Sequence, residues 1–242
     1  MVTGRATRRG RSVGPDYICI GAQRCGTTSL RTYLNAHPQI SSYGGETNFF
    51  TQHFRKGVTW YESVLGNGEI RGEKTPEYIV CPYVPKRIKA TCPNVKLIVM
   101  LRNPVDRIQS HFRLATHLNN ERKPFEKAYR GGIGLRRPGW YSYLRRGHYA
   151  EQLEHWFKFF PREQFLIVHS ERFFEDTDTV YQEILEFLGA KPYHLETYRR
   201  AGRVPVKKPD LSLKMLTMLQ GYYRLHNERL YELLDYDFGW NA

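Results

Sequence analysis

A short apolar run, a loop with two glycines and a helical segment open this chain and constrain its fold more than any other feature. Residues 17–21 (Tyr-Ile-Cys-Ile-Gly) read as a β-strand, and residues 27–36 are expected to form a helix. Gly21 and Gly26 have the Gly-x-x-x-x-Gly spacing of a phosphate loop. The alternative is a tight turn with a threonine cap. Because the loop opens a helix, we expect it to bind an anion.

Further apolar runs alternate with helical patterns along the chain. Strands are predicted at residues 95–101 and 164–168, and helices after Asn103 and at residues 148–160, 179–188 and 211–234. Asn103 is a typical N-cap because Pro104 follows it at the first helical position. This alternation predicts an α/β fold with a parallel central sheet flanked by helices. In such sheets, ligands bind beyond the carboxyl ends of the strands.

The charge balance of the chain indicates a polyanionic partner. The 242 residues include 37 Lys and Arg against 24 Asp and Glu, a formal net charge of +13. Nucleic acid, an anionic lipid surface, an anionic glycan and a multiply phosphorylated cofactor all fit this charge, and composition does not choose among them. The 4 cysteines are too few for a disulfide scaffold, so we expect free thiols.

The glycine loop lacks the residues of an ordinary nucleotidase. Thr27 stands where the lysine of an ATP or GTP loop belongs. Arg102 follows the strand 95–101, where a metal-holding aspartate would be expected, and an arginine there attracts an anion and repels Mg²⁺. Ser110 lies eight residues further along the next helix. We therefore expect the loop to hold a phosphate-like group without a metal, and Arg102 with Ser110 to hold a second phosphate.

Two separate motifs resemble one enzyme family. Residues 21–30 resemble the 5′-phosphosulfate loop of sulfotransferases that use 3′-phosphoadenosine 5′-phosphosulfate (PAPS), and residues 102–107 with Ser110 resemble their 3′-phosphate motif. Other similar segments follow in the family's order, at residues 46–50, 73–78, 147–156, 171–173 and 222–234. The chain is most similar to heparan-sulfate-type carbohydrate sulfotransferase domains and their bacterial relatives. The resemblance covers residues 15–240.

This resemblance implies the P-loop-like PAPS sulfotransferase fold and a transfer reaction. A sulfuryl group would pass from PAPS to a hydroxyl or amine of an acceptor by in-line displacement, without a metal. By resemblance, Glu46 is the catalytic base, although it would also suit a helix N-terminus. Lys74 would neutralise the leaving phosphate; its alternative is a surface lysine paired with Glu73 or Glu77. Arg24, where relatives often carry lysine, would clamp the 5′-phosphosulfate and is the third predicted catalytic residue.

The predicted donor-binding residues come from three segments. They are Arg24, Cys25, Gly26, Thr27, Thr28 and Ser29 of the loop, Arg102 and Ser110, and Arg200, Gly202 and Arg203. The last three belong to a basic segment that resembles the loop closing over the 3′-phosphate; the alternative is a solvated basic loop. Cys25 lies beside Arg24 at a helix N-terminus, so the pKa of its thiol should fall. The favoured interpretation of this cysteine is nevertheless a small residue that fills space in the packing.

The acceptor is expected to be a carbohydrate. His53, Arg55 and Tyr78 are the predicted acceptor-binding residues, and arginines stand among aromatic residues over 136–146. Such a mixture suits sugars that carry carboxylates or sulfates, and it would also suit RNA. By resemblance we favour carbohydrate over a lipid, polyketide or other small-molecule alcohol. A Mg²⁺-dependent kinase and a nucleic-acid-binding module are remote alternatives, and we expect no nucleic-acid partner.

One domain over residues 16–242 is expected, preceded by a basic disordered arm at residues 1–15. The apolar run 97–101 is far shorter than the roughly 20 residues that span a bilayer, and no secretory signal is visible. We therefore predict a cytoplasmic, bacterial type of enzyme without a Golgi anchor, and leave the oligomeric state open. His111 and His117 are predicted to be surface histidines and not metal ligands.

Overall fold

A parallel sheet forms the centre of the computed structural model, which describes residues 13–130 and 142–241. Five strands pair in the order β2-β3-β1-β4-β5, and every pairing is parallel. Their bounds are β1 (Tyr17–Gly21), β2 (Ile40–Ser42), β3 (Ile70–Lys74), β4 (Lys96–Leu101) and β5 (Phe165–His169). The α/β fold class predicted from the sequence is confirmed.

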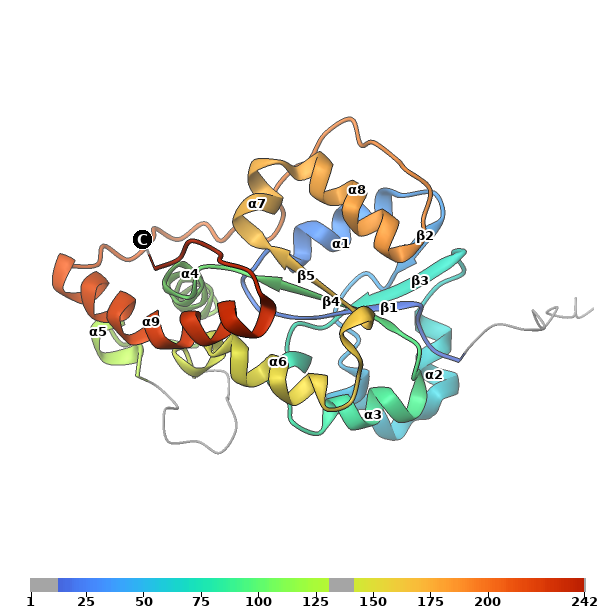
Figure 1. The fold of residues 1–242 in the computed structure, drawn as a ribbon, viewed down its shortest axis with the longest axis horizontal. Coiled ribbons are helices and arrows are strands. Elements are labelled where there is room, and N and C mark those ends of the chain that lie inside the picture. The colour runs from blue at the N-terminus through green and yellow to red at the C-terminus, as the bar shows by residue number, and fades with distance from the viewer. Residues whose placement is uncertain (1–12, 131–141, 242) are drawn as a thin grey trace, which may run out of the picture.

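Helices cover both faces of the sheet (Figure 1). On one face lie α1 (Thr27–Ala36), α7 (Ser170–Glu175) and α8 (Thr177–Leu188). On the other face lie α2 (Gly57–Val64), α3 (Val84–Thr91) and α6 (Tyr149–Phe157). The central strands β1 and β4 are buried on both sides, which explains why their sequences read as unbroken apolar runs.

A second group of helices stands beside the sheet: α4 (Pro104–His117), α5 (Phe125–Ala128) and α9 (Leu213–Leu234) (Figure 1). They enclose an apolar cluster of their own, which includes Ile108, Phe125, Leu219 and Tyr223. This cluster fixes the direction of α4, the helix that carries Ser110. His111 points into it and is completely buried, so its prediction as a surface histidine was wrong, whereas His117 is exposed.

The helix ends follow the chemistry of their sequences. Asn103 caps α4, and its side-chain oxygen accepts a hydrogen bond from the Val105 N–H at 2.9 Å. Gly189 ends α8 with a φ of 77°, a left-handed conformation that glycine adopts readily. The predicted helix 27–36 agrees with α1 at both ends.

Strands β2 and β3 were not predicted from the sequence, because β2 has only 3 residues and β3 is polar. Arg71, Glu73 and Lys74 are all buried in β3, and each has hydrogen-bond or ion-pair partners there. Charged residues in a buried strand hide the apolar pattern on which strand prediction depends. This strand can be buried because residues from other elements pair with its charged side chains.

The amino-terminal boundary differs from the predicted one. Gly14 and Pro15, which we assigned to the basic arm, are buried. The Gly14 N–H donates to Glu62, and its carbonyl accepts from Arg71 at 2.8 Å. Residues 1–12 lie outside the described part of the chain. Within the described part, no helix combines the length and the apolar character needed to cross a membrane.

Candidate active site

A basic hollow of about 390 Å³ lies where β1 and β4 run into the helices that follow them. Five guanidinium groups and no carboxylate line it. Its lining consists of Arg24, Gly26, Thr27, Thr28, Arg102, Ser110, Arg113, Phe174, Arg200, Ala201, Gly202, Arg203 and Val204. The structure thus brings the three predicted donor-binding segments together in one place. Arg102 pairs with Asp106 at 3.6 Å, outside this lining. The excess of positive charge that remains is what a multiply anionic ligand requires.

We call this hollow the donor pocket, because residues predicted to bind the donor line it; the loop after β1 forms one wall. Gly26 has a φ of 98°, and a Cβ atom there would lie 2.9 Å from the Phe174 ring, so only glycine fits. Thr27 begins α1, where the first N–H groups of the helix are available to an anion. Ser29 is buried, and its hydroxyl accepts a hydrogen bond from the Ala201 N–H at 2.9 Å. Ser29 therefore anchors the opposite wall through its side chain.

Arg24 reaches across the donor pocket to the second motif. Its Nε atom donates to the Ser110 hydroxyl at 3.0 Å, and its guanidinium also donates to the Gly202 carbonyl at 3.4 Å. Burial lowers the pKa of Arg24, and the positive charges of Arg102 and Arg113 lower it further. An anion among these groups would offset that repulsion. The predicted 5′-phosphosulfate clamp thus contacts two residues predicted for the 3′-phosphate.

The segment around Gly202 forms the cover of the donor pocket. Arg113 holds it, donating to the carbonyl oxygens of Val206 at 2.7 Å and Val204 at 2.9 Å. Arg200 lies over the Phe174 ring at 4.2 Å from its centroid. The placement of Arg200, Gly202 and Arg203 beside the loop favours the closing-loop interpretation over a solvated loop.

Four lining residues were not predicted from the sequence: Ala201 and Val204, which flank predicted residues of the covering segment, and Arg113 and Phe174. Arg113 lies three residues after Ser110, on the same face of α4, and that spacing was a usable signal. Phe174 had no such signal, because it approaches Gly26 only through the packing of α7. Both residues therefore belong to the pocket together with the predicted ones.

Glu46 and Lys74 form an ion pair near the carboxyl end of β3. The Lys74 Nζ atom lies 2.7 Å from a Glu46 carboxylate oxygen, and the exposed fractions of the two side chains are 8% and 43%. The alternative partners considered for Lys74, Glu73 and Glu77, are thus incorrect. Lys74 stands in register with Cys19, two residues before the phosphate loop. Two of the three predicted catalytic residues therefore lie together, with the carboxylate open to solvent, whereas Arg24 contacts Ser110 and Gly202.

Two predicted contacts do not reach the surface of the site. Tyr78 is completely buried, and its hydroxyl donates to Glu73 and accepts from the Phe50 N–H, so it does not line an acceptor site. Cys25 is also completely buried, and burial raises the pKa of its thiol to about 11. The predicted fall in its pKa was wrong, and its role as a small filler is confirmed. Its thiol contacts the Tyr149 hydroxyl at 3.7 Å.

The predicted acceptor-binding groups are only partly placed. His53 is half-buried beside Trp60, with 5.4 Å between ring centroids, and Arg55 is exposed. Residues 131–141 lie outside the described residues. Arg146, from the same basic cluster, is buried and donates to both carboxylate oxygens of Glu77 at 2.8 Å. Arg146 therefore stabilises the fold and does not face an acceptor.

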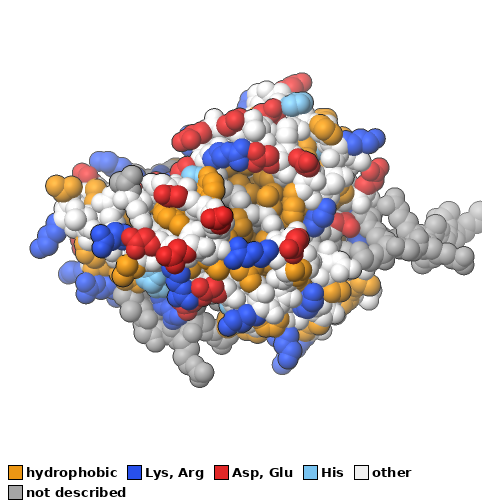
Figure 2. All heavy atoms as spheres, viewed as in Figure 1, with side chains coloured by type: hydrophobic (Ala, Val, Ile, Leu, Met, Phe, Trp, Pro, Cys, Tyr) orange, Lys and Arg blue, Asp and Glu red, His pale blue; other side chains and the backbone are white. Residues whose placement is uncertain are grey.

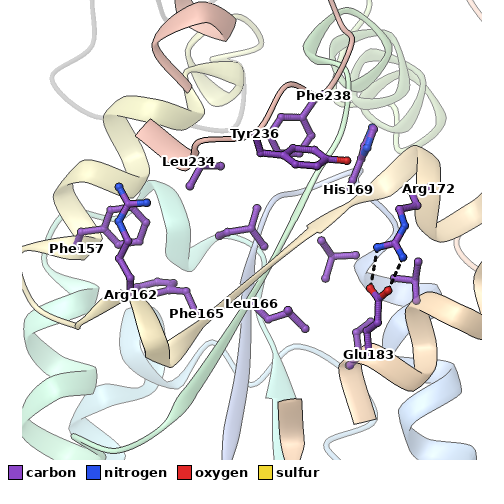
Figure 3. Close-up of a pocket in the computed structure, with 14 residues that line it drawn as sticks. Phe157, Arg162, Phe165, Leu166, His169, Arg172, Glu183, Leu234, Tyr236 and Phe238 are labelled. Carbon is purple, nitrogen blue, oxygen red and sulfur yellow. Dashed lines mark hydrogen bonds and ion pairs between the residues drawn. The ribbon is translucent and has the colours of Figure 1, made fainter. Parts of the chain in front are cut away.

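A second hollow, of about 340 Å³, follows the outer strand β5 and differs chemically from the donor pocket. Figure 3 shows it between Phe157, Phe165 and Phe238, with the Arg172–Glu183 pair at one side. In Figure 2, apolar side chains gather near the middle of the visible face, between interspersed acidic and basic ones. Its lining is largely apolar, Arg172 is paired with Glu183, and Arg162 donates to the Leu233 carbonyl and lies over the Phe157 ring, so this hollow suits an anion less well than the basic one. Across the described residues, no cluster of three metal-binding side chains occurs.

The comparisons with known proteins agree with this geometry. The family model described as the sulfotransferase domain matches residues 14–229. The chain belongs to the sulfotransferase family. Human heparan sulfate glucosamine 3-O-sulfotransferase 6 is 32% identical over 97% of this chain and 76% of its own length. Human heparan sulfate glucosamine 3-O-sulfotransferase 3A1 is 31% identical over 94% of this chain and 63% of its own length.

A solved structure shows the same fold. The crystal structure of a sulfotransferase from Alicyclobacillus acidocaldarius aligns with a TM-score of 0.82 at 23% identity. The alignment covers 94% of this chain and 99% of the other. This sulfotransferase chain is therefore a transferase, and its family implies PAPS as the donor. The arginine-rich pocket fits a donor with two separate phosphate-like groups.

Proposed function

We propose that this sulfotransferase moves a sulfuryl group from PAPS to a hydroxyl group of a carbohydrate, with Glu46 as the base. The observation that supports the donor most directly is the convergence of five arginines with Thr27 and Thr28, without a carboxylate in the lining. Guanidinium groups form paired hydrogen bonds with phosphate oxygens, and a helix N-terminus adds N–H donors. When bound, PAPS supplies the activated sulfuryl group.

The chain supplies the remaining parts of the reaction. Glu46 is open enough to accept the proton of an acceptor hydroxyl, and general-base catalysis requires such contact. Lys74 holds the carboxylate at 2.7 Å and brings a buried positive charge to the carboxyl edge of the sheet. We propose that this charge stabilises the leaving phosphate. Arg24, between the two phosphate motifs, binds and orients the donor.

Carbohydrate is the acceptor class that the relatives favour. The two human relatives are named for 3-O-sulfation of glucosamine in heparan sulfate, which is an anionic polysaccharide. The net charge of +13 suits an anionic acceptor. His53 and Arg55 follow Glu46 closely and stay predicted acceptor contacts. The relatives do not favour a lipid or polyketide acceptor.

A thermal-shift titration tests the donor. The product nucleotide, 3′-phosphoadenosine 5′-phosphate (PAP), is compared with ADP and with ATP plus Mg²⁺. At 100 times its Kd, a ligand stabilises the folded state by about 2.7 kcal/mol. For a chain of this size that corresponds to a rise in Tm of roughly 5–11 °C. We expect this rise with PAP alone and without Mg²⁺; a rise only with Mg²⁺-ATP would replace the sulfotransferase reaction with a kinase reaction.

Transfer from PAPS tests the acceptor. Heparan-type polysaccharide, a neutral polysaccharide and a long-chain alcohol are each incubated with enzyme and PAPS, and mass spectrometry detects added sulfate. Sulfation of the anionic polysaccharide alone is expected, and sulfation of the alcohol alone would contradict the carbohydrate proposal. Cytoplasmic location and bacterial type stay predictions, and cell fractionation would test the location.

A further inference from the structure

A fully buried carboxylate lies next to Lys74 in the chain, and four hydroxyl groups surround it. Glu73 accepts hydrogen bonds from Tyr61 at 2.5 Å, Thr75 at 2.8 Å and Tyr78 at 3.2 Å, and also from Thr47. Burial raises the pKa of Glu73, and the four hydrogen bonds act in the opposite direction. Among the described residues, no ion pair to Glu73 is formed. Hydroxyl donors therefore stabilise this carboxylate.

Three of these hydroxyls also accept hydrogen bonds from consecutive backbone N–H groups. The Asn48 N–H donates to the Thr75 hydroxyl at 3.4 Å. The Phe49 N–H donates to the Thr47 hydroxyl at 3.2 Å, and the Phe50 N–H donates to the Tyr78 hydroxyl at 3.2 Å. Each hydroxyl thus links one N–H group to the carboxylate of Glu73.

These N–H groups stand at the start of a helical turn that begins three residues after Glu46. A π-helical turn spans Phe49–His53, and Asn48 before it has a left-handed φ of 48° with no side-chain cap. The first N–H groups of any helix lack partners within the helix and carry partial positive charge. The hydroxyls and the carboxylate behind them satisfy these groups. Glu73 therefore caps this turn indirectly, from the interior of the sheet.

We infer that Glu73 is a positioning residue for Glu46, an inference that rests on the proposed function. Through Thr47, Thr75 and Tyr78 it holds the backbone of residues 47–50 against the end of β3. Glu73 and Lys74 are consecutive in this strand, so their side chains leave it on opposite sides. One strand end thereby fixes the backbone behind the base and also supplies the lysine that holds its carboxylate at 2.7 Å.

The hydrogen bonds around residue 73 require a group that only accepts, which is a carboxylate. An ionised carboxylate only accepts, so all four hydroxyls can donate to it and still accept from the backbone. An amide would place two N–H donors against the same hydroxyls. A hydroxyl that accepts from both the amide and the backbone would have to turn its own hydrogen away from Glu73. The Glu73→Gln variant should therefore loosen residues 47–50 although its side chain has nearly the same volume.

The test compares Glu73→Gln with Tyr61→Phe as a matched control. Both changes disturb the hydrogen bonds of the same carboxylate, but the Tyr61 hydroxyl comes from α2 and is not one of the three that accept from residues 48–50. We expect Glu73→Gln to speed hydrogen exchange at the amides of residues 48–50. It should also lower kcat by up to about 100-fold, the effect of a small misplacement of a reacting group.

The donor affinity separates positioning from general damage to the fold. None of the pocket-lining residues belongs to the Glu73 network, so the Kd for PAP should stay unchanged in Glu73→Gln. Tyr61→Phe should lower Tm yet keep kcat and the exchange at residues 48–50 close to wild type. An equal loss of kcat in Tyr61→Phe, or a parallel loss of PAP affinity in Glu73→Gln, would overturn the inference.

A second pair of variants tests the same inference if Glu73→Gln does not fold. Thr47→Val removes only the hydroxyl that serves the Phe49 N–H, and Thr47→Ser restores it. We expect Thr47→Val to have a lower kcat and faster hydrogen exchange at the Phe49 amide. In Thr47→Ser, both kcat and the exchange rate should return close to the wild-type values. If Glu46→Gln abolishes turnover while Glu73→Gln and Thr47→Val match wild type, only this inference fails. If wild-type enzyme transfers nothing from PAPS, the proposed function itself fails.

Discussion

Replacing Arg24 with methionine tests which part of the donor this residue binds. The sequence resemblance assigned Arg24 to the 5′-phosphosulfate, whereas its guanidinium contacts Ser110 and Gly202, both predicted for the 3′-phosphate. If the contacts reflect its role, the loss should fall on nucleotides that carry a 3′-phosphate. PAP and adenosine 5′-monophosphate (AMP) differ only in that group, so their affinities report it directly.

The size of the effect follows from the type of contact. A hydrogen bond to a charged group contributes about 1.5–3 kcal/mol. The loss of one such contact should therefore weaken PAP binding by roughly 10- to 150-fold. The stability of the free protein should change little, since the lost hydrogen bonds to Ser110 and Gly202 are offset by relief of repulsion from Arg102 and Arg113. An Arg24→Lys variant keeps the charge but not the planar fork of donors, and should lose less affinity.

Isothermal titration calorimetry of both nucleotides with wild type, Arg24→Met and Arg24→Lys measures these affinities. We expect Arg24→Met to weaken PAP strongly and AMP by less than about threefold. An equal loss for both nucleotides would place Arg24 on the 5′ group and refute the reasoning from its contacts. Unchanged affinity for both would remove Arg24 from the donor site.

Three further predictions concern the base, the loop and the helix interface. Glu46→Gln should lower kcat by roughly 10²- to 10⁴-fold in steady-state assays with PAP affinity unchanged, and near-normal turnover would exclude it as the base. Gly26→Ala should destabilise the fold by about 2–5 kcal/mol in urea denaturation, from a left-handed φ and a clash with Phe174; an unchanged midpoint would contradict this. His148 stacks on His226 with 3.8 Å between ring centroids, and burial lowers its pKa from 6.5 to about 3. The unfolded chain therefore binds a proton at this histidine more readily than the folded protein, so the free energy of unfolding should fall as pH drops from 6.5 towards 3. His148→Gln should flatten that dependence in urea denaturation between pH 7.5 and 5, and an equally steep loss would contradict it.

Local sequence patterns were sufficient for the central part of the fold. The strand–loop–helix unit at residues 17–36, the buried strand β4 and the Asn103 cap each have a pattern that is complete within a short stretch of sequence. Apolar runs and capping residues can be recognised there although the strands themselves pair with distant segments. The same patterns could not assign β3, whose charged residues are neutralised by partners from distant segments.

The residues of the donor site were largely predictable, but their contacts were not. Two separated motifs indicated two anion sites, and the structure brings both to one pocket. Which way Arg24 points depends on the approach of α4 and of the segment around Gly202. Tyr78 and His111 were misplaced for a related reason, because sequence spacing does not say which neighbouring element covers a side chain.

The sequence by itself indicated the family of this protein through a glycine loop, two predicted phosphate motifs, a predicted base and a lysine in the order of one family. The tertiary structure decided which groups meet. The Glu46–Lys74 pair joins residues 28 positions apart, and Arg24 contacts a serine 86 positions away. Such contacts depend on strand order and helix packing, which arise from burial over the whole chain and leave no local pattern in the sequence.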